Sequence, residues 1–497
     1  MNKPISKFAV VCSIAVLMAG CAVGPDFQRP APPSVKGYTS ESHPVSPDTA
    51  AHGQQFVEGR DIPAQWWELF HSPALNQLVE RALKANPNLQ AAQATLRQAQ
   101  ENVYAAEGTL YPAVNANGSV ARERTNGAQN GQSIPGSVFT LYNASVSVSY
   151  GIDLFGIARR GLESVQAQHD FQRFQLEGAY LTLTSNVVTT AVQEASLRAQ
   201  IAATREIIDA EAQQLDVLQK QFSVGGVSQS SVLAQQTALA QTRAGLPQLE
   251  KQLSQIRNQL AALAGDFPSE NSAAPFELDM LQLPQQLPVS LPSRLVEQRP
   301  DIRAAESQLH VASAQVGVAT ADMFPQLTLS ANAGSVANSA GNLFSTGSGI
   351  WSVGAGLVQP IFRGGTLLHQ KRAAVAAYDA AAAQYRSVVL SAFQDVANVL
   401  DALQSDDRIF EAQTAAAQSA ADSLDITQKQ YQIGAASYLA LLNAQQAYQQ
   451  TRIALAQARA SRYADTAALF HSLGGGWWNR DDVTGQTGQQ ISGADKQ

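Results

Sequence analysis

Alternation of apolar and polar residues marks four short segments of the chain. In residues 140–154, aliphatic or aromatic side chains alternate with Asn, Ser, Gly and Asp, and residues 113–124, 326–336 and 350–362 repeat the same period of two. This period is typical of a strand with one apolar face and one polar face. The pattern predicts four strands. Across residues 140–154, the apolar face comprises Tyr142, Ala144, Val146, Val148, Tyr150 and Ile152.

These strands fit two kinds of sheet. In an outer-membrane β-barrel, lipid contacts the apolar face and water the polar face, whereas a half-buried sheet of a soluble domain shows the same alternation. Four strands cannot close a barrel, and an open sheet edge is not tolerated in lipid. A barrel would therefore need two, three or four copies of the chain, giving about eight, twelve or sixteen strands, and the pattern does not choose among them.

Apolar residues in the rest of the chain recur at helical spacing. Steps of three and four run through residues 157–222 and 366–431, which predicts two helices of about 60 residues, each roughly 90 Å long. Residues 228–264 and 437–473 place many apolar side chains seven apart, which is typical of helices that pack against neighbouring helices. Helices this long suit a rod rather than one globular core. Two shorter helices, each followed by a proline, are expected at residues 73–110 and 293–323.

The same order of elements occurs twice. Residues 87–112 align without gaps with residues 300–325, and residues 221–225 align with residues 430–434. Pro247 is expected to kink or break the helix in which it lies. The predicted organisation is a signal peptide (1–20), an extended N-terminal arm (21–63), a first repeat unit (64–265), a proline-rich connector (266–292), a second repeat unit (293–474) and a flexible C-terminal tail (475–497).

The N-terminus has the features of an export signal. Two lysines precede an apolar run that is too short to span a bilayer. Residues 17–21 resemble the lipobox of bacterial lipoproteins, in which cleavage leaves the cysteine as the acylated first residue, and this predicts lipidation of Cys21. The alternative is an ordinary signal peptide cleaved nearby, which would leave Cys21 as a free thiol. Ala22 stands where Asp would resemble an inner-membrane retention mark, which favours the outer membrane.

Composition excludes several other classes of protein. Only 15% of the residues are charged, against about 25% in a typical soluble domain, and the net charge of −7 argues against nucleic-acid binding. Two cysteines and seven scattered histidines form neither a disulfide scaffold nor a metal-ligand motif. Asp153 and Glu163 allow an acid–base interpretation, but Asp153 ends a predicted strand and is interpreted as structural. No enzyme activity, no metal and no cofactor other than a covalent lipid on Cys21 are expected.

Several short motifs occur in order along the chain. They are residues 21–27 with Pro30, residues 66–70 with Leu75, residues 150–156, residues 260–265, and Arg299-Pro300-Asp301. With these motifs the sequence resembles outer-membrane factor lipoproteins of the TolC superfamily, especially the OprM/NodT-like group, over nearly the whole mature chain.

The resemblance implies a mostly helical fold with a smaller β part. It implies a homotrimer with a shared 12-stranded outer-membrane β-barrel and a 12-helix coiled-coil tunnel through the periplasm. The chain would dock onto a periplasmic adaptor and an inner-membrane pump of the resistance-nodulation-division class, and would passively conduct small molecules such as drugs or toxic organics. Two alternatives stay open. One is a structural coiled-coil lipoprotein that tethers the envelope without conducting, and the other is a type I protein-secretion channel.

The resemblance also implies particular site residues. Two helical turns would be the periplasmic tips that contact the adaptor, although a plain hairpin turn would also carry their glycines. Relatives close the tunnel after the second tip, and many carry aspartate where this chain has Asn443. We therefore expect a mainly steric gate. The tip residues are Val224, Gly225, Ser228, Ile433, Gly434 and Ser437, and the gate residues are Tyr431, Leu439 and Asn443.

Overall fold

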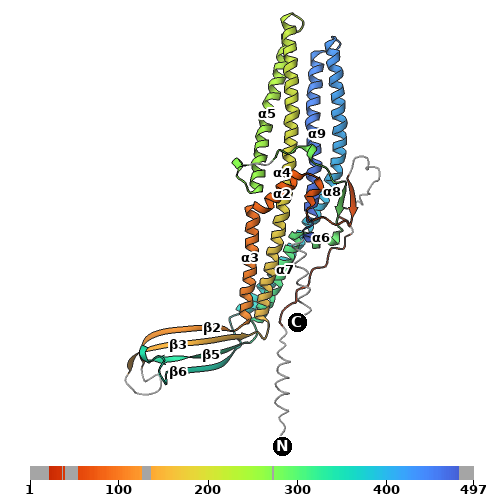
Figure 1. Ribbon diagram of the computed structural model, residues 1–497. Coiled ribbons are helices and arrows are strands. Elements are labelled where there is room, and N and C mark those ends of the chain that lie inside the picture. Colours follow the sequence, from red (N-terminus) through yellow and green to blue (C-terminus); the bar gives the residue numbers. More distant parts are fainter. Residues whose placement is uncertain (1–21, 36, 40–53, 126–135, 271–273, 481–497) are drawn as a thin grey trace. The chain divides into compact units, whose positions relative to one another are not determined.

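The computed structural model of the protein describes residues 22–35, 37–39, 54–125, 136–270 and 274–480. These residues are mostly helical (Figure 1). The expected signal peptide, Cys21 and most of the expected C-terminal tail lie outside them. The chain forms two compact units. Unit 1 contains Met1–Pro30, Thr95–Arg173 and Ala304–Arg386, and unit 2 contains Ala31–Ala94, Phe174–Arg303 and Ser387–Gln497.

The four segments with alternating polarity form one antiparallel sheet in unit 1. Its order is β2-β3-β5-β6, so β3 pairs with both its neighbour in sequence and a strand that follows much later (Figure 1). The prediction of these four strands is confirmed. Their bounds are Ala113–Thr125 for β2, Ser137–Ile152 for β3, Gln326–Ala337 for β5 and Gly349–Val358 for β6.

The strand register brings the apolar positions of all four strands to one face. Val146 of β3 lies opposite Ala116 of β2 and Ala333 of β5, and the next residue, Ser147, lies opposite Asn115 and Asn332. Residues directly opposite each other point to the same side of a sheet, so one face carries aliphatic and aromatic side chains and the other carries Ser, Asn, Thr and Gly. The apolar face is open to the surroundings of this chain. Its most exposed large side chains include Val114, Val120, Trp351, Val353 and Leu357.

The expected long helices are present with bounds close to the prediction. In unit 2, α5 returns alongside α4 and α9 returns alongside α8 (Figure 1). None of the helices in the described part of the chain is long and apolar enough to cross a membrane. The helices are α2 (Pro73–Ala85), α3 (Pro87–Glu107), α4 (Ile157–Ser223), α5 (Gln229–Ala264), α6 (Pro292–Gln298), α7 (Pro300–Ala321), α8 (Thr366–Gln432) and α9 (Tyr438–Ser472).

Each of the two shorter expected helices is broken in the structure. The first is divided at Asn86 and the second at Arg299, where the backbone is extended with ψ of 121° and 124°. Both residues precede a proline, whose ring disfavours helical backbone in the residue before it. Asn86 also caps α3. Its Oδ1 accepts hydrogen bonds from the N–H of Asn88 at 2.9 Å and from the N–H of Leu89 at 3.2 Å. Prediction of single helices over residues 73–110 and 293–323 was therefore wrong.

Two further features of unit 2 concern Pro247 and a pair of short strands. Of the two expected effects of Pro247, a kink or a break, the break does not occur, because α5 is one helix on both sides of it. A short parallel pair of strands, β1 (Gln55–Glu58) and β4 (Gln286–Val289), joins segments expected to be an arm and a connector. Neither strand shows a clear alternation, and β4 contains a proline, which the sequence rules place at sheet edges.

The described core of unit 2 is rich in aromatic residues. Trp66 stacks on Phe470 with ring centroids 5.3 Å apart, and Trp67 and Phe70 are fully buried beside them. The guanidinium of Arg480 lies 4.3 Å from the centroid of the Tyr180 ring. These contacts attach the residues around α2 and the end of the described chain to α4 and α9.

Two glycines with similar backbone conformation provide a test of close packing. Gly265 has φ of 82°, and a Cβ there would lie 2.6 Å from the carbonyl oxygen of Ala85, whereas Gly225 has φ of 77° and open space around it. We expect Gly265→Ala to lower the free energy of unfolding by about 3 kcal/mol, from left-handed strain and the clash together, and Gly225→Ala by about 1 kcal/mol, from strain alone. Thermal unfolding of the purified variants measures the difference. Equal losses would contradict the close approach at Gly265.

Candidate functional site

The two predicted tips are helical turns of matching geometry. Gly225 and Gly434 both have φ of 77°, and a Cβ added to either would meet no neighbouring group within 4 Å, so backbone conformation rather than crowding favours glycine. Ser228 caps α5 by accepting a hydrogen bond from the N–H of Ser231, and Ser437 caps α9 in the same way through the N–H of Ala440. Each turn exposes one aliphatic side chain. These are Val224, 82% exposed, and Ile433, 81% exposed.

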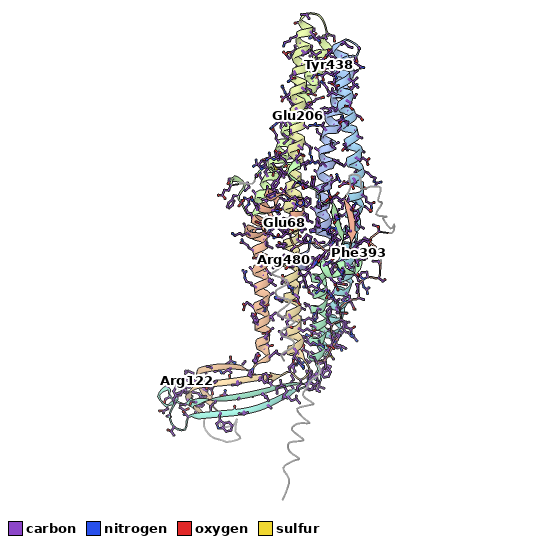
Figure 2. All side chains as sticks on the ribbon, turned by 45° about the vertical axis from the view of Figure 1, so that its right-hand side comes forward. Glu68, Arg122, Glu206, Phe393, Tyr438 and Arg480 are labelled. Carbon is purple, nitrogen blue, oxygen red and sulfur yellow. The ribbon has the colours of Figure 1, made fainter. Side chains whose placement is uncertain are left out.

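A cluster of tyrosine and glutamine side chains lies beside the tips in unit 2. Tyr431 of α8 and Tyr438 of α9 meet edge to face, with ring centroids 6.1 Å apart, and Figure 2 places Tyr438 near the ends of the hairpins. The Tyr431 hydroxyl donates to Oε1 of Gln221 at 3.5 Å, and the Tyr438 hydroxyl donates to Oε1 of Gln235. The cluster therefore connects the α8–α9 hairpin to the α4–α5 hairpin.

The buried side of this cluster ends in a carboxyl group. Nε2 of the fully buried Gln235 donates to the carbonyl oxygen of Glu211 at 2.9 Å, and the Thr242 hydroxyl donates to Oε1 of Glu211 at 3.2 Å. Burial raises the pKa of Glu211. These neutral partners fit a carboxyl that helps to pack α4 against α5.

The structure brings only one of the predicted gate residues into this cluster. Tyr431 belongs to it, whereas Leu439 and Asn443 are exposed on α9, four residues apart and thus on one side of the helix. Sequence reasoning missed Tyr438, Gln221 and Gln235. A signal for Gln235 was available, because it falls three residues after Val232 and four before Leu239, within the apolar stripe of its helix.

A second buried group of charges lies between α8 and α9. Arg462 lies in α9 at the seven-residue spacing that Leu441, Leu455 and Leu469 share. Its guanidinium bonds the carboxylate of Asp407 at 2.8 Å and lies 4.8 Å from the centroid of the Phe410 ring. Burial and a hydrogen bond with the neighbouring Asp465 raise the pKa of Asp406. The raised pKa favours the neutral form of Asp406, which lowers the negative charge around the Arg462 guanidinium.

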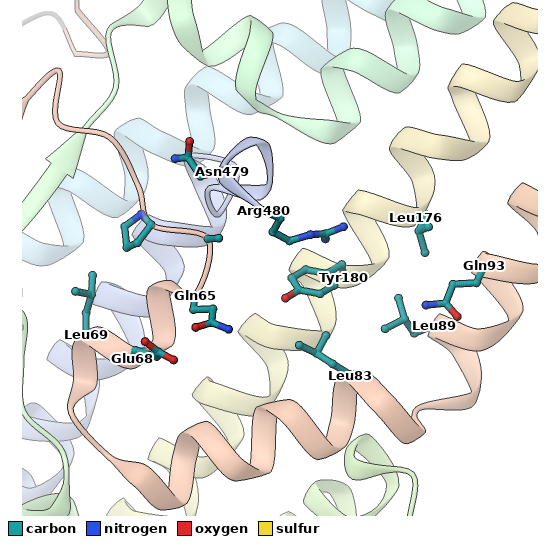
Figure 3. A pocket seen from close by; sticks show the side chains of 12 residues that line it. Gln65, Glu68, Leu69, Leu83, Leu89, Gln93, Leu176, Tyr180, Asn479 and Arg480 are labelled. Atoms are coloured by element: carbon teal, nitrogen blue, oxygen red, sulfur yellow. The ribbon is translucent and has the colours of Figure 1, made fainter. Parts of the chain in front are cut away.

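Asp153 and the wall of a cavity of unit 2 are both held by structural hydrogen bonds or ion pairs. Asp153 accepts hydrogen bonds from the backbone N–H and Nε of Arg159 at the start of α4, as expected for a structural role. The cavity has a volume of about 750 Å³, and Figure 3 shows Arg480 beside the Tyr180 ring in its wall. Glu177 holds Arg480 at 2.8 Å, so the positive charge is already paired. No group of three or more His, Cys, Asp or Glu side chains suited to a metal occurs among the described residues.

Comparison with known proteins gives one family. The family described as "Outer membrane efflux protein" matches residues 78–266 and 291–475. The probable efflux pump outer membrane protein TtgC of Pseudomonas putida is 31% identical over 495 residues, which is 99% of both chains. The pyoverdine export outer membrane protein OpmQ of Pseudomonas aeruginosa is 32% identical over 83% of this chain and 87% of its own. The solved outer-membrane channel OprN superposes with a TM-score of 0.84 at 28% identity, covering 92% of this chain and all of that one.

The raised pKa of Asp406 predicts how stability depends on pH. Because the folded-state pKa lies above the unfolded value, the folded chain binds more protons between the two values, and this contribution to stability falls as pH rises. We expect Asp406→Asn to be more stable than the wild type at pH about 8, with the advantage shrinking toward pH about 4. Thermal unfolding across that range measures it. Asp422→Asn, at an exposed carboxyl of the same helix, is the control, and the same pH dependence in both variants would contradict the assignment.

Proposed function

This chain belongs to the outer membrane efflux protein family, and we propose that three copies form a gated channel that passively conducts small molecules out of the periplasm. Its relatives and structural neighbours are outer-membrane channels rather than enzymes, and the protein is located in the outer membrane. A periplasmic adaptor and an inner-membrane transporter of the resistance-nodulation-division class would supply the cargo and the energy. A lipid on Cys21 would add a second attachment to the membrane.

The sheet of unit 1 is the observation that supports this proposal most strongly. Within the described part of the chain, its edge strands, β2 and β6, each pair with a single strand. Backbone groups at a sheet edge cannot remain unpaired in lipid, so β2 of one copy would pair with β6 of the next. Three copies supply about twelve strands, which falls within the range of bacterial barrels.

The length of the apolar face fits a bilayer. On β3 the lipid-facing residues run from Tyr142 to Ile152, close to the 9–11 residues of a tilted membrane strand. The pattern ends where β2 reaches Arg122, Glu123 and Arg124, and Figure 2 shows Arg122 at the end of the sheet away from the helices of unit 1. Charged side chains there would meet water on the outer side of the membrane.

The helical hairpins would form the periplasmic part of the channel. Exposed Val224 and Ile433 give each tip a small apolar surface beside a capped helix start, which suits the side of an adaptor helix. Tyr431, Leu439 and Asn443 would narrow the tunnel without a ring of charge. The bond from Tyr431 to Gln221 supports this role, because it ties the second hairpin to the first.

Neighbouring residues on opposite faces of β3 test the barrel. Val146→Arg would place a charge in lipid at a cost of about 2–4 kcal/mol near the bilayer midplane, whereas Ser147→Arg would place it in the water-filled interior. We expect Val146→Arg to remove the heat-modifiable oligomer from outer-membrane fractions. Ser147→Arg should assemble and shift the ion selectivity of the channel in planar bilayers toward anions.

The same measurements distinguish the alternatives. Equal tolerance of the two arginines would contradict a lipid-facing β3. An oligomer of wild-type protein that gives no conductance in a planar bilayer would instead support a structural coiled-coil lipoprotein.

The gate is tested by shortening its side chains. We expect Tyr431→Ala combined with Leu439→Ala to raise the closed-state single-channel conductance, because both changes widen the tunnel and the first removes the bond to Gln221. Ile433→Ala, at the exposed tip turn, is the control and should leave conductance unchanged. Wild-type conductance in the double variant would overturn the gate assignment.

A further inference from the structure

The first described residues of the chain are bound to unit 1 by backbone and charge contacts. The N–H of Val23 donates to the carbonyl oxygen of Phe155 at 3.0 Å, at the junction between β3 and α4. Nε of Arg160 donates to the carbonyl oxygen of Val23 at 3.4 Å, and its Nη2 bonds Oδ1 of Asp26 at 2.5 Å. We call the segment Ala22–Phe27, with these partners, the N-terminal clamp.

Glycines allow the clamp to approach its partners closely. Gly24 has φ of 99°, and a Cβ on it would lie 2.5 Å from the Cα of Gly317 in α7. Gly156 has φ of 87°, and a Cβ on it would lie 2.6 Å from the Cβ of Ala22. Because the atom facing Gly24 is backbone and its own φ is left-handed, a larger residue at position 24 would displace the segment.

A chain of polar contacts holds the far end of the clamp. The Arg160 side chain is only 7% exposed and also bonds Oε2 of Glu163 at 2.7 Å. Oε1 of Glu163 lies 2.9 Å from Nε2 of His310, and the ring of Phe27 stacks on His310 with centroids 4.2 Å apart. Farther along, Nε of Arg29 donates to Glu306 at 3.0 Å. The buried guanidinium of Arg160 would be costly to leave without a partner, and its bonds to Asp26 and Glu163 therefore favour this one geometry.

The clamp is attached where the strands meet the helices of unit 1. Each of the four strands has an aromatic residue just beyond this end, and two of these rings, those of Phe155 and Phe324, stack with centroids 4.8 Å apart. Aromatic side chains gather at the boundary between hydrocarbon and headgroups in membrane barrels. These aromatic residues are Tyr111, Phe155, Phe324 and Phe362. Phe155, whose carbonyl oxygen accepts the hydrogen bond from Val23, is one of them.

We propose that the N-terminal clamp fixes the acylated end of the chain at the level of this aromatic belt, so that the lipid and the strand ends enter the same leaflet. The partner surface is the phospholipid headgroup layer on the periplasmic side. The contacts of the clamp set the depth of the N-terminus in the bilayer. The lipid adds membrane affinity but does not change that depth. This inference rests on the proposed function, because it requires a membrane-spanning sheet and a lipid on Cys21.

Depth measurements with and without the lipid test the clamp. A fluorophore is attached to Gln28→Cys, at an exposed position of the arm, and its quenching by headgroup-nitroxide phospholipid is measured in proteoliposomes. The non-lipidated form carries Cys21→Ser behind an ordinary signal peptide. Gly24→Val opens the clamp, and Gly37→Val, where a Cβ meets nothing closer than 3.7 Å, is the control on the same arm.

We expect equal quenching in the lipidated and non-lipidated forms when the clamp is intact. In the non-lipidated Gly24→Val form, quenching should fall by more than about twofold, because neither the clamp nor a lipid then holds the segment near the headgroups. Gly37→Val should match the intact protein. Loss of quenching on removing the lipid alone, or unchanged quenching in non-lipidated Gly24→Val, would overturn the proposal.

A second label separates this outcome from failure of the channel itself. Val353→Cys lies on the exposed apolar face of β6, 77% exposed in the single chain, and should be quenched by acyl-chain nitroxides in every form. Quenching at Val353→Cys together with a failed result at Gln28→Cys would overturn the clamp alone. If Val353→Cys is not quenched either, the sheet is not in the bilayer, and both the proposed function and the clamp are wrong.

Discussion

Satisfaction of backbone hydrogen bonds constrains this protein more than any other interaction. The sheet of unit 1 has four strands, an exposed apolar face and two edges that have no neighbouring strand among the described residues. In water, an edge can bond to solvent, but an exposed face of Val, Leu and Trp side chains is unfavourable. In lipid, the face is favourable but the edges are not. Pairing between copies, as proposed above, would meet both requirements, and the sheet would then be complete in an oligomer.

In the helical hairpins, the constraint comes from buried polar side chains rather than from backbone groups. Each hairpin of unit 2 packs through apolar stripes, yet polar groups such as Gln235 and Arg462 are buried at positions where the heptad pattern would accept leucine. Each of them has a defined partner on the neighbouring helix, in the carbonyl oxygen of Glu211 and the carboxylate of Asp407. A buried polar group favours one register, because sliding the helices would leave it without that partner. Specific alignment of long helices is therefore obtained at some cost in stability.

The sequence was sufficient for those features that depend on short-range periodicity. The four strands, their apolar faces and the long helices follow from periods of two and of about 3.6, because each residue's environment is set by its own element. The breaks at Asn86 and Arg299 were also encoded by the following prolines, but the apolar pattern continues across them. Contacts between distant segments could not be predicted in this way. Such contacts depend on which elements become neighbours, and the sequence of one partner does not show which residue it will contact. Examples are the β1–β4 pair, the bond between Tyr438 and Gln235, and the ion pair of Arg462.

The chemistry of the sheet bears on which molecules the proposed channel would pass. Along the spanning part of the described strands, the polar face carries hydroxyl, amide and glycine groups, as in Asn115, Ser147 and Asn332. Such groups can donate to or accept from many solutes but hold none of them by charge, and loss of a single neutral hydrogen bond costs about 1 kcal/mol. Strongly bonded charges in this chain are instead engaged with one another, as Arg160 is with Asp26 and Glu163. A channel with this lining would admit many kinds of small molecule, and discrimination among them would then occur before they enter it.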